Sequence, residues 1–147
     1  MERLAGDGLV ADRPIIYSVA ATPSQLQEYN YHLWTEAPTV MLRDQLVAYL
    51  RSAKAATKVL TPEMRAIPDY VLGGKIRRLE QVIGSPPRVV VELELAIRRS
   101  RDSRIVFLDT YRAEVNTTGD SIGAAVAAMS QALAQVYAKF VKDLSKI

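Results

Sequence analysis

The sequence predicts an α+β domain in which an antiparallel meander sheet packs against two amphipathic helices and follows an N-terminal β-hairpin. Residues 88–99 alternate apolar and polar side chains, as in a strand with one buried face. Residues 37–53 and the stretch from residue 122 onward instead repeat apolar side chains at three- and four-residue spacing, which is typical of helices with one buried stripe. At 147 residues the chain has the length of one domain, so we expect residues 1–147 to fold as a single unit.

The composition is that of an ordinary globular protein, with 49% hydrophobic and 24% charged residues. The sequence as given has no cysteine, which excludes disulfides, thiolate metal sites, cysteine nucleophiles and a lipidated cysteine within it. Its start lacks the basic and apolar segments of a signal peptide, and no apolar run approaches the ~20 residues that span a bilayer. Two alternatives remain open: a cytosolic protein, or a mature domain whose targeting segment was removed.

Residues 1–12 contain a Gly-Asp-Gly turn signal and are expected to form a loose lead-in. Residues 15–19 are β-branched and aromatic, and we expect an edge strand there because the preceding proline lacks a ladder donor. Residues 20–25 are predicted to form the turn. Residues 27–34 are expected to pair back as a second strand, since apolar and polar side chains alternate along them.

Pro38 suits the first turn of a helix, where its missing N–H is not needed, and the apolar stripe predicts this first helix over residues 37–53. Residues 56–60 are predicted to form a short strand that ends before Pro62.

The sheet is then expected to continue as a meander. Residues 69–83 change the parity of their apolar positions, which predicts a bulge near residues 73–74 or 77–78. Residues 88–99 and 104–115 follow as further strands. The Thr-Gly-Asp-Ser sequence at 118–121 offers side chains that cap a helix, and a long second helix is expected from there to the C-terminus.

The net charge of +3 is unevenly distributed, because residues 51–112 carry +6 and residues 1–50 carry −3. A basic face that includes Arg77, Arg78, Arg98 and Arg99 could meet phosphates or an acidic partner. The alternative, which we favour, is that these strands carry basic residues on a solvated face. Nucleic-acid binding is disfavoured, because the strands lack aromatic residues at alternate positions for base stacking.

Catalytic groups are scarce. His32 is the only histidine, and we expect it on a solvated strand face. Glu92 and Glu94 form a carboxylate pair on one strand face, for which ion pairing with neighbouring arginines is a better interpretation than acid–base catalysis. The sequence therefore predicts no catalytic residue, no metal site and no cofactor.

The aromatic residues Tyr17, Tyr29, Tyr31 and Trp34 are concentrated in a short stretch, and such side chains are enriched where proteins meet partners. They form the predicted partner-binding surface. The competing interpretation is that Trp34 is buried and anchors the first helix. The sequence leaves both open.

The chain resembles the ABC-type transport auxiliary lipoprotein component family, the paraquat-inducible protein C-like proteins. The resemblance rests on the order of several motifs, from about residue 9 to residue 144. They are DRPIIY, then Tyr-x-Tyr-His-x-Trp-x-Glu-x-Pro, then Met-Leu-x(3)-Leu-x(3)-Leu, then DYVLGGKIRRLEQ, a Val/Leu-rich strand and a terminal alanine-rich helix.

This resemblance implies a non-catalytic periplasmic domain, held by an acylated cysteine at the inner membrane or at the inner face of the outer membrane. It implies an ABC permease complex and a mammalian-cell-entry-domain protein as partners, and lipid movement between the two membranes as the process. A homo-oligomer is also compatible with it. The absence of a lipidated cysteine from the sequence departs from the family pattern. The alternative function is a cytosolic α+β module that binds nucleic acid or an acidic protein.

Overall fold

The computed structural model describes all residues, 1–147, and contains one six-stranded sheet, two α-helices and two short 3-10 helices. In chain order the elements are β1 (Ala5–Gly6), η1 (Gly8–Ala11), β2 (Pro14–Val19), β3 (Thr22–Leu33), α1 (Pro38–Ser52), η2 (Pro62–Met64), β4 (Tyr70–Ile83), β5 (Arg88–Arg99), β6 (Ile105–Asn116) and α2 (Ile122–Leu144).

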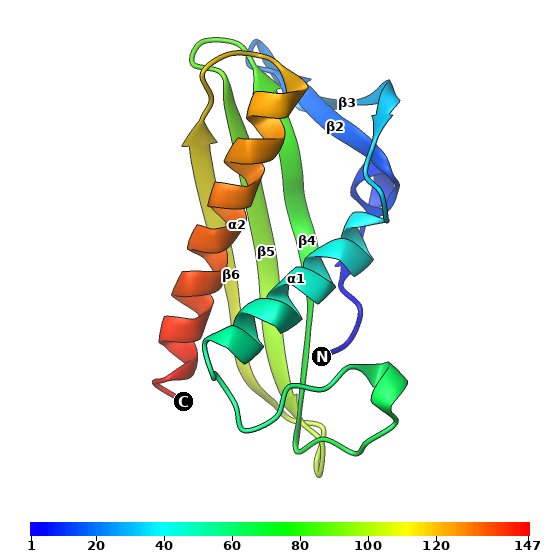
Figure 1. Cartoon of the computed structure of the whole chain (residues 1–147), viewed down its shortest axis with the longest axis vertical. Helices are drawn as coiled ribbons and strands as arrows, with labels where there is room; N and C mark the ends of the chain where they lie inside the picture. The colour runs from blue at the N-terminus through cyan, green and yellow to red at the C-terminus, as the bar shows by residue number, and fades with distance from the viewer.

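The predicted α+β class is confirmed, and the sheet has the order β3-β2-β4-β5-β6. Strands β4, β5 and β6 form the expected antiparallel meander, while β2 and β3 form the expected N-terminal hairpin. The two parts are joined by parallel pairing of β2 with β4, and the two-residue strand β1 also pairs parallel with β4. The sheet is therefore mixed. Both α-helices lie across the same face of it (Figure 1).

The core lies between this face and the helices. On β5, four alternating side chains face the helices and are fully buried: Val89, Val91, Leu93 and Leu95. From α2, Phe140 is fully buried, and its ring centroid lies 5.8 Å from those of both Phe107 and Tyr111 on β6. The predicted alternation of residues 88–99 thus marks the strand around which the core forms.

Both α-helices begin where local chemistry predicts. Pro38 occupies the first turn of α1. At the start of α2, the Ser121 hydroxyl accepts a hydrogen bond from the backbone N–H of Ala124 at 3.1 Å, which satisfies one of the free donors of the first turn. The first expected helix is confirmed to within one residue at each end, and the second is confirmed but ends at Leu144, three residues before the predicted C-terminal end.

The N-terminal hairpin differs from the prediction. Strand β2 is an inner strand between β3 and β4, so the expectation that residues 15–19 form an edge strand was wrong. The predicted turn over 20–25 is also wrong beyond its first two residues, because β3 begins at Thr22 and contains Pro23. This proline is tolerated because β3 is the strand at the edge of the sheet.

Two other segments depart from expectation. Residues 56–60, predicted as a strand, form no strand, since no neighbouring strand pairs with them. Residues 1–12, expected to be a loose lead-in, contain β1 and η1 and bury Leu4 and Val10 in the core.

The predicted change of register in β4 lies between Ile76 and Arg78, at the second of the two expected positions. Gly74 has a different role, because it pairs with Leu95 where the two backbones approach closely. A Cβ placed on Gly74 would overlap the carbonyl oxygen of Glu94 and lie 2.9 Å from Cδ2 of Leu95. The absence of a side chain at residue 74 is therefore a packing requirement.

We expect Gly74→Ala to lower the free energy of unfolding by about 2 kcal/mol or more, because backbone atoms that cannot move independently would have to shift. The matched control is Gly73→Ala, where a Cβ would meet only Glu2 Oε2 at 3.4 Å, an ordinary contact. Urea unfolding of both variants is the measurement. Equal midpoints would contradict the close approach at Gly74.

Candidate functional site: the β3 surface

Strand β3 is unusual because it has no buried face. Among its twelve residues only Tyr29 is partly buried, and the others are exposed. Its outer edge has no pairing strand, so a row of backbone donors and acceptors is free. Three large apolar side chains are exposed along it, namely Leu26, Tyr31 and Leu33. We call β3 with these three side chains the β3 surface.

A long bulge places Tyr31 in solvent. On β2 the step from Pro14 to Ile16 is two residues, whereas their partners on β3, Leu33 and Glu28, are five residues apart. The extra length belongs to β3, and such irregularities re-aim side chains. Tyr31 lies in this bulge and is 92% exposed.

Tyr17 and Tyr29 form a tilted pair of aromatic rings. Their ring centroids are 4.4 Å apart. The Tyr17 hydroxyl donates to Oε1 of Gln27 at 2.7 Å, and the Tyr29 hydroxyl donates to Oε1 of Gln81 on β4 at 2.9 Å. The pKa of Tyr29 is raised, mainly by partial burial and to a smaller extent by the nearby Tyr17. The Tyr29 hydroxyl therefore stays protonated and remains a hydrogen-bond donor at neutral pH. This pair attaches the hairpin to the sheet.

Gln81 is the centre of that attachment. It is buried on β4, and while its Oε1 accepts from Tyr29, its Nε2 donates to the backbone oxygen of Asp120 at 2.8 Å, just before α2. A single buried amide thus joins β3, β4 and the start of α2. The sequence did not single out Gln81, because its role appears only once β2 and β4 are known to be neighbours.

Trp34 was predicted either to bind a partner or to be buried as an anchor of the first helix, and its burial is intermediate between these two roles. It is half-buried and packs against the core cluster. Its backbone is fixed by Arg13, since the Trp34 N–H donates to the Arg13 carbonyl at 2.8 Å and the Arg13 Nε donates to the Trp34 carbonyl at 3.0 Å. The four predicted aromatic residues therefore do not form one continuous patch. Only Tyr31 is fully presented to solvent.

The four arginines of the predicted basic face each have an acidic partner. Arg77 pairs with Glu94 at 2.5 Å, Arg78 with Glu80, Arg98 with Glu2 at 3.6 Å and Arg99 with Asp102 at 3.0 Å. The positive charge of this face is largely compensated by neighbouring carboxylates.

Glu92 and Glu94 also lie within this set of ion pairs, since Arg112 contacts Glu92 at 3.4 Å. His32 is exposed on β3, with its ring edge-on to Tyr29 at a centroid distance of 5.5 Å. The structure thus places His32 on β3 and both glutamates on β5, where each carboxylate contacts an arginine.

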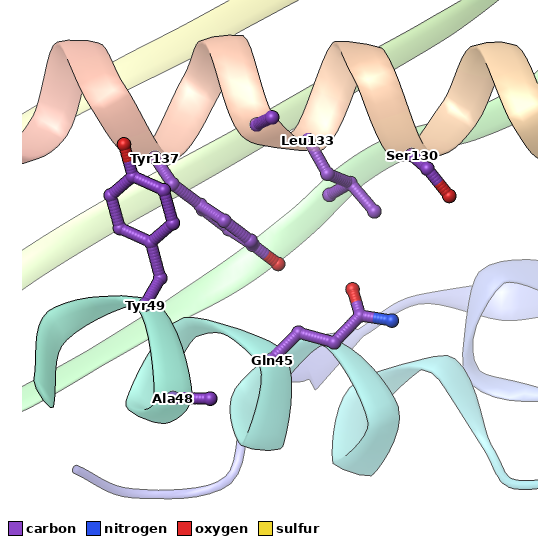
Figure 2. Close-up of a pocket in the computed structure, with 7 residues that line it drawn as sticks. Gln45, Ala48, Tyr49, Ser130, Leu133 and Tyr137 are labelled. Atoms are coloured by element: carbon purple, nitrogen blue, oxygen red, sulfur yellow. The ribbon is translucent and has the colours of Figure 1, made fainter. Parts of the chain in front are cut away.

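A shallow groove between α1 and α2 was not anticipated from the sequence. It has a volume of about 310 Å³ and is lined by Gln45, Ala48, Tyr49, Ser130, Leu133, Ala134 and Tyr137 (Figure 2). The ring centroids of Tyr49 and Tyr137 are 5.6 Å apart, and the Tyr137 hydroxyl donates to the backbone oxygen of Leu42 at 3.3 Å. Burial raises the pKa of Tyr137, which keeps this hydroxyl neutral. No charged side chain lines the groove.

No cluster of three or more potential metal-binding side chains occurs in the structure. None of the helices combines the length and the apolar character that crossing a bilayer requires.

Comparison with known proteins decides the family. The family model for the ABC-type transport auxiliary lipoprotein component matches residues 10–141. The chain belongs to this family. The resemblance predicted from the motifs is confirmed. Membership of this family gives the protein an auxiliary role in ABC-type transport and a membrane-associated location in the cell envelope.

Solved structures agree in fold. A Xanthomonas campestris protein superposes with a TM-score of 0.85 at 26% identity, covering 95% of this chain and 78% of that one. An uncharacterised protein gives 0.79 at 20% identity, with 97% and 88% covered. A candidate lipoprotein of Caulobacter crescentus gives 0.52 at 18% identity, with 74% and 80% covered. No curated protein matches the chain significantly.

The different burial of Tyr31 and Trp34 predicts different effects of their alanine variants on the stability of the protein. We expect Trp34→Ala to lower the free energy of unfolding by about 1–3 kcal/mol, because its partly buried side chain packs against the core cluster. Tyr31→Ala should stay within about 0.5 kcal/mol of the parent, since its side chain is solvated. Urea unfolding measures both. A large loss for Tyr31→Ala would show that its ring has a structural role.

Proposed function

We propose that the protein is a non-catalytic periplasmic lipoprotein domain that assists an ABC and mammalian-cell-entry-type system in moving lipids between the inner and outer membranes. The observation that carries the proposal is the family match over residues 10–141, which includes nearly all of the sheet and α2. The family supplies the transport context and the lipoprotein character. Our proposal adds three points to the family match: the lipid cargo, the periplasmic location and the mammalian-cell-entry partner.

The β3 surface supports a docking role. An extended partner segment could pair with the free edge of β3 through main-chain hydrogen bonds and gain specificity from the exposed side chains beside it. Tyr31 is suited to such a contact, because its ring offers a large rigid area at small entropic cost. The mammalian-cell-entry-domain protein or the ABC permease complex is the proposed occupant.

A non-catalytic role is supported by the state of the polar groups. Glu92 and Glu94, the two carboxylates weighed for acid–base chemistry, are each bound by an arginine. The groove between α1 and α2 offers neutral hydroxyl and amide groups. These groups suit binding better than bond cleavage.

The docking proposal is tested with the triple variant Leu26→Ala, Tyr31→Ala and Leu33→Ala. We expect the yield of transporter components that co-purify with the tagged protein to fall at least tenfold, since exposed aromatic anchors dominate such interfaces. The double variant Gln135→Ala and Ile147→Ala, which also changes exposed residues but lies away from β3, should keep the parent yield. Undiminished co-purification of the triple variant would exclude β3 as the docking surface.

The broader assignment is tested by the gene context. We expect a lipoprotein signal upstream of the codons for this chain, and genes for an ABC permease and a mammalian-cell-entry-domain protein beside it. A context without any of these genes would contradict the proposed transport system while leaving the family membership intact.

A further inference from the structure

The large exposed apolar side chains fall into two main groups. One is the β3 surface. The other lies at the opposite, lower end of the sheet in Figure 1, where the connection from α1 to β4 and the β5–β6 turn meet. Its members are Met64, Ile67, Tyr70, Ile105 and Val106. We call residues 62–70 and 98–106 the tip.

The two segments of the tip are held together by the sheet. Tyr70 is the register partner of Arg99, and Arg98 is the register partner of Ile105. The Ser100 N–H donates to the Asp69 carbonyl at 2.9 Å. The exposed apolar residues of both segments therefore lie at one end of the molecule.

This end exposes more apolar surface than a solvated loop requires. All nine residues from 62 to 70 are exposed, and Ile67 is 96% exposed while Met64, Tyr70 and Ile105 are each more than half exposed. An isolated exposed apolar residue needs no explanation, but a cluster of this size at one end of the sheet indicates a contact surface.

Unpaired positive charge surrounds these side chains. The 18 residues of the tip carry five arginines and three acidic residues, so they account for +2 of the net charge of +3. Two of the acids are neutralised, Glu63 by Arg43 and Asp102 by Arg99. Arg65, Arg101 and Arg104 form no ion pair, in contrast to the paired arginines of the sheet face.

We propose that the tip docks end-on to the surface of an anionic phospholipid bilayer, inserting Ile67 and its apolar neighbours between headgroups while Arg65, Arg101 and Arg104 contact lipid phosphates. Exposed aliphatic side chains at the end of the sheet suit a fluid interface, which needs no matching pocket. The long arginine side chains can reach headgroup phosphates beside them, and Tyr70 has the amphipathic character found at membrane interfaces.

A bilayer fits these observations better than an acidic protein. Protein interfaces concentrate aromatic anchors at their centre, whereas the exposed apolar side chains of the tip are non-aromatic apart from Tyr70. The inference goes beyond the proposed docking at β3 and does not depend on it, because the two surfaces share no residue.

The experiment is flotation of the purified domain with vesicles of phosphatidylcholine alone or of phosphatidylcholine with phosphatidylglycerol, at low and at high salt. We expect binding to the anionic vesicles only, weakened by salt because the attraction is screened. Arg101→Gln with Arg104→Gln should weaken that binding at least tenfold, since each basic residue near the surface contributes about a fivefold factor. Ile67→Ser should weaken it several-fold.

Each variant has a matched control. Gln131→Glu with Gln135→Glu lowers the net charge by the same two units on the exposed side of α2, and Tyr31→Ser removes an equally exposed apolar side chain from β3. Both controls should bind like the parent, and circular dichroism confirms that all variants are folded. The proposal is overturned if the parent protein does not float with anionic vesicles, which is the result expected if the tip binds an acidic protein. It is also overturned if the tip variants and the control variants lose vesicle binding equally. Co-purification with the transporter is a separate readout, so either proposal can fail alone.

Discussion

The burial of one face of β5 is the constraint on which the rest of the structure depends. This strand pairs along its length with both β4 and β6, and its Val89, Val91, Leu93 and Leu95 are fully covered. Both helices bury their apolar stripes above this meander, so their orientation follows from it. The opposite face carries the ion pairs. Packing therefore defines the position of each polar group, and the N-terminal hairpin is added at the edge of an already covered sheet.

The sequence predicted elements whose signal is local. Residues 88–99 were placed without error because their alternating apolar side chains form one buried face, although Val90 on the other face is buried too, and α2 was found from its stripe and its Ser121 cap. It did not predict the parallel pairing of β2 with β4, since no local pattern says which distant strand becomes a neighbour. Residues 56–60 have strand-forming side chains but no partner, and β1 is too short to leave a periodic signal.

The candidate site was less accessible from the sequence for related reasons. The arginines of the basic face were identified, but their pairing with carboxylates depends on the register between strands, which composition does not contain. The aromatic cluster was identified as well, yet Tyr29 packs against Tyr17 and is partly buried, whereas Tyr31 is 92% exposed. Strand β3 is exposed on both sides and has no core face. The alternation of its side chains therefore does not predict which of them are buried, as the alternation in β5 does. The tip was not predicted from the sequence, because its two segments are distant from each other in the chain.

The attachment of the β2–β3 hairpin bears on energetics as well as on shape. It joins β4 through three register pairs, Tyr17–Val19 with Gln81–Ile83, and through the buried amide of Gln81. Segments with few buried attachments open more readily than the core to which they are joined. A ligand that binds only the docked hairpin has its apparent affinity scaled by the fraction of molecules in which the hairpin is docked. Gln81, although buried and remote from the exposed edge, would then set how available that edge is, and substitutions there would tune recognition without altering a single contacting residue.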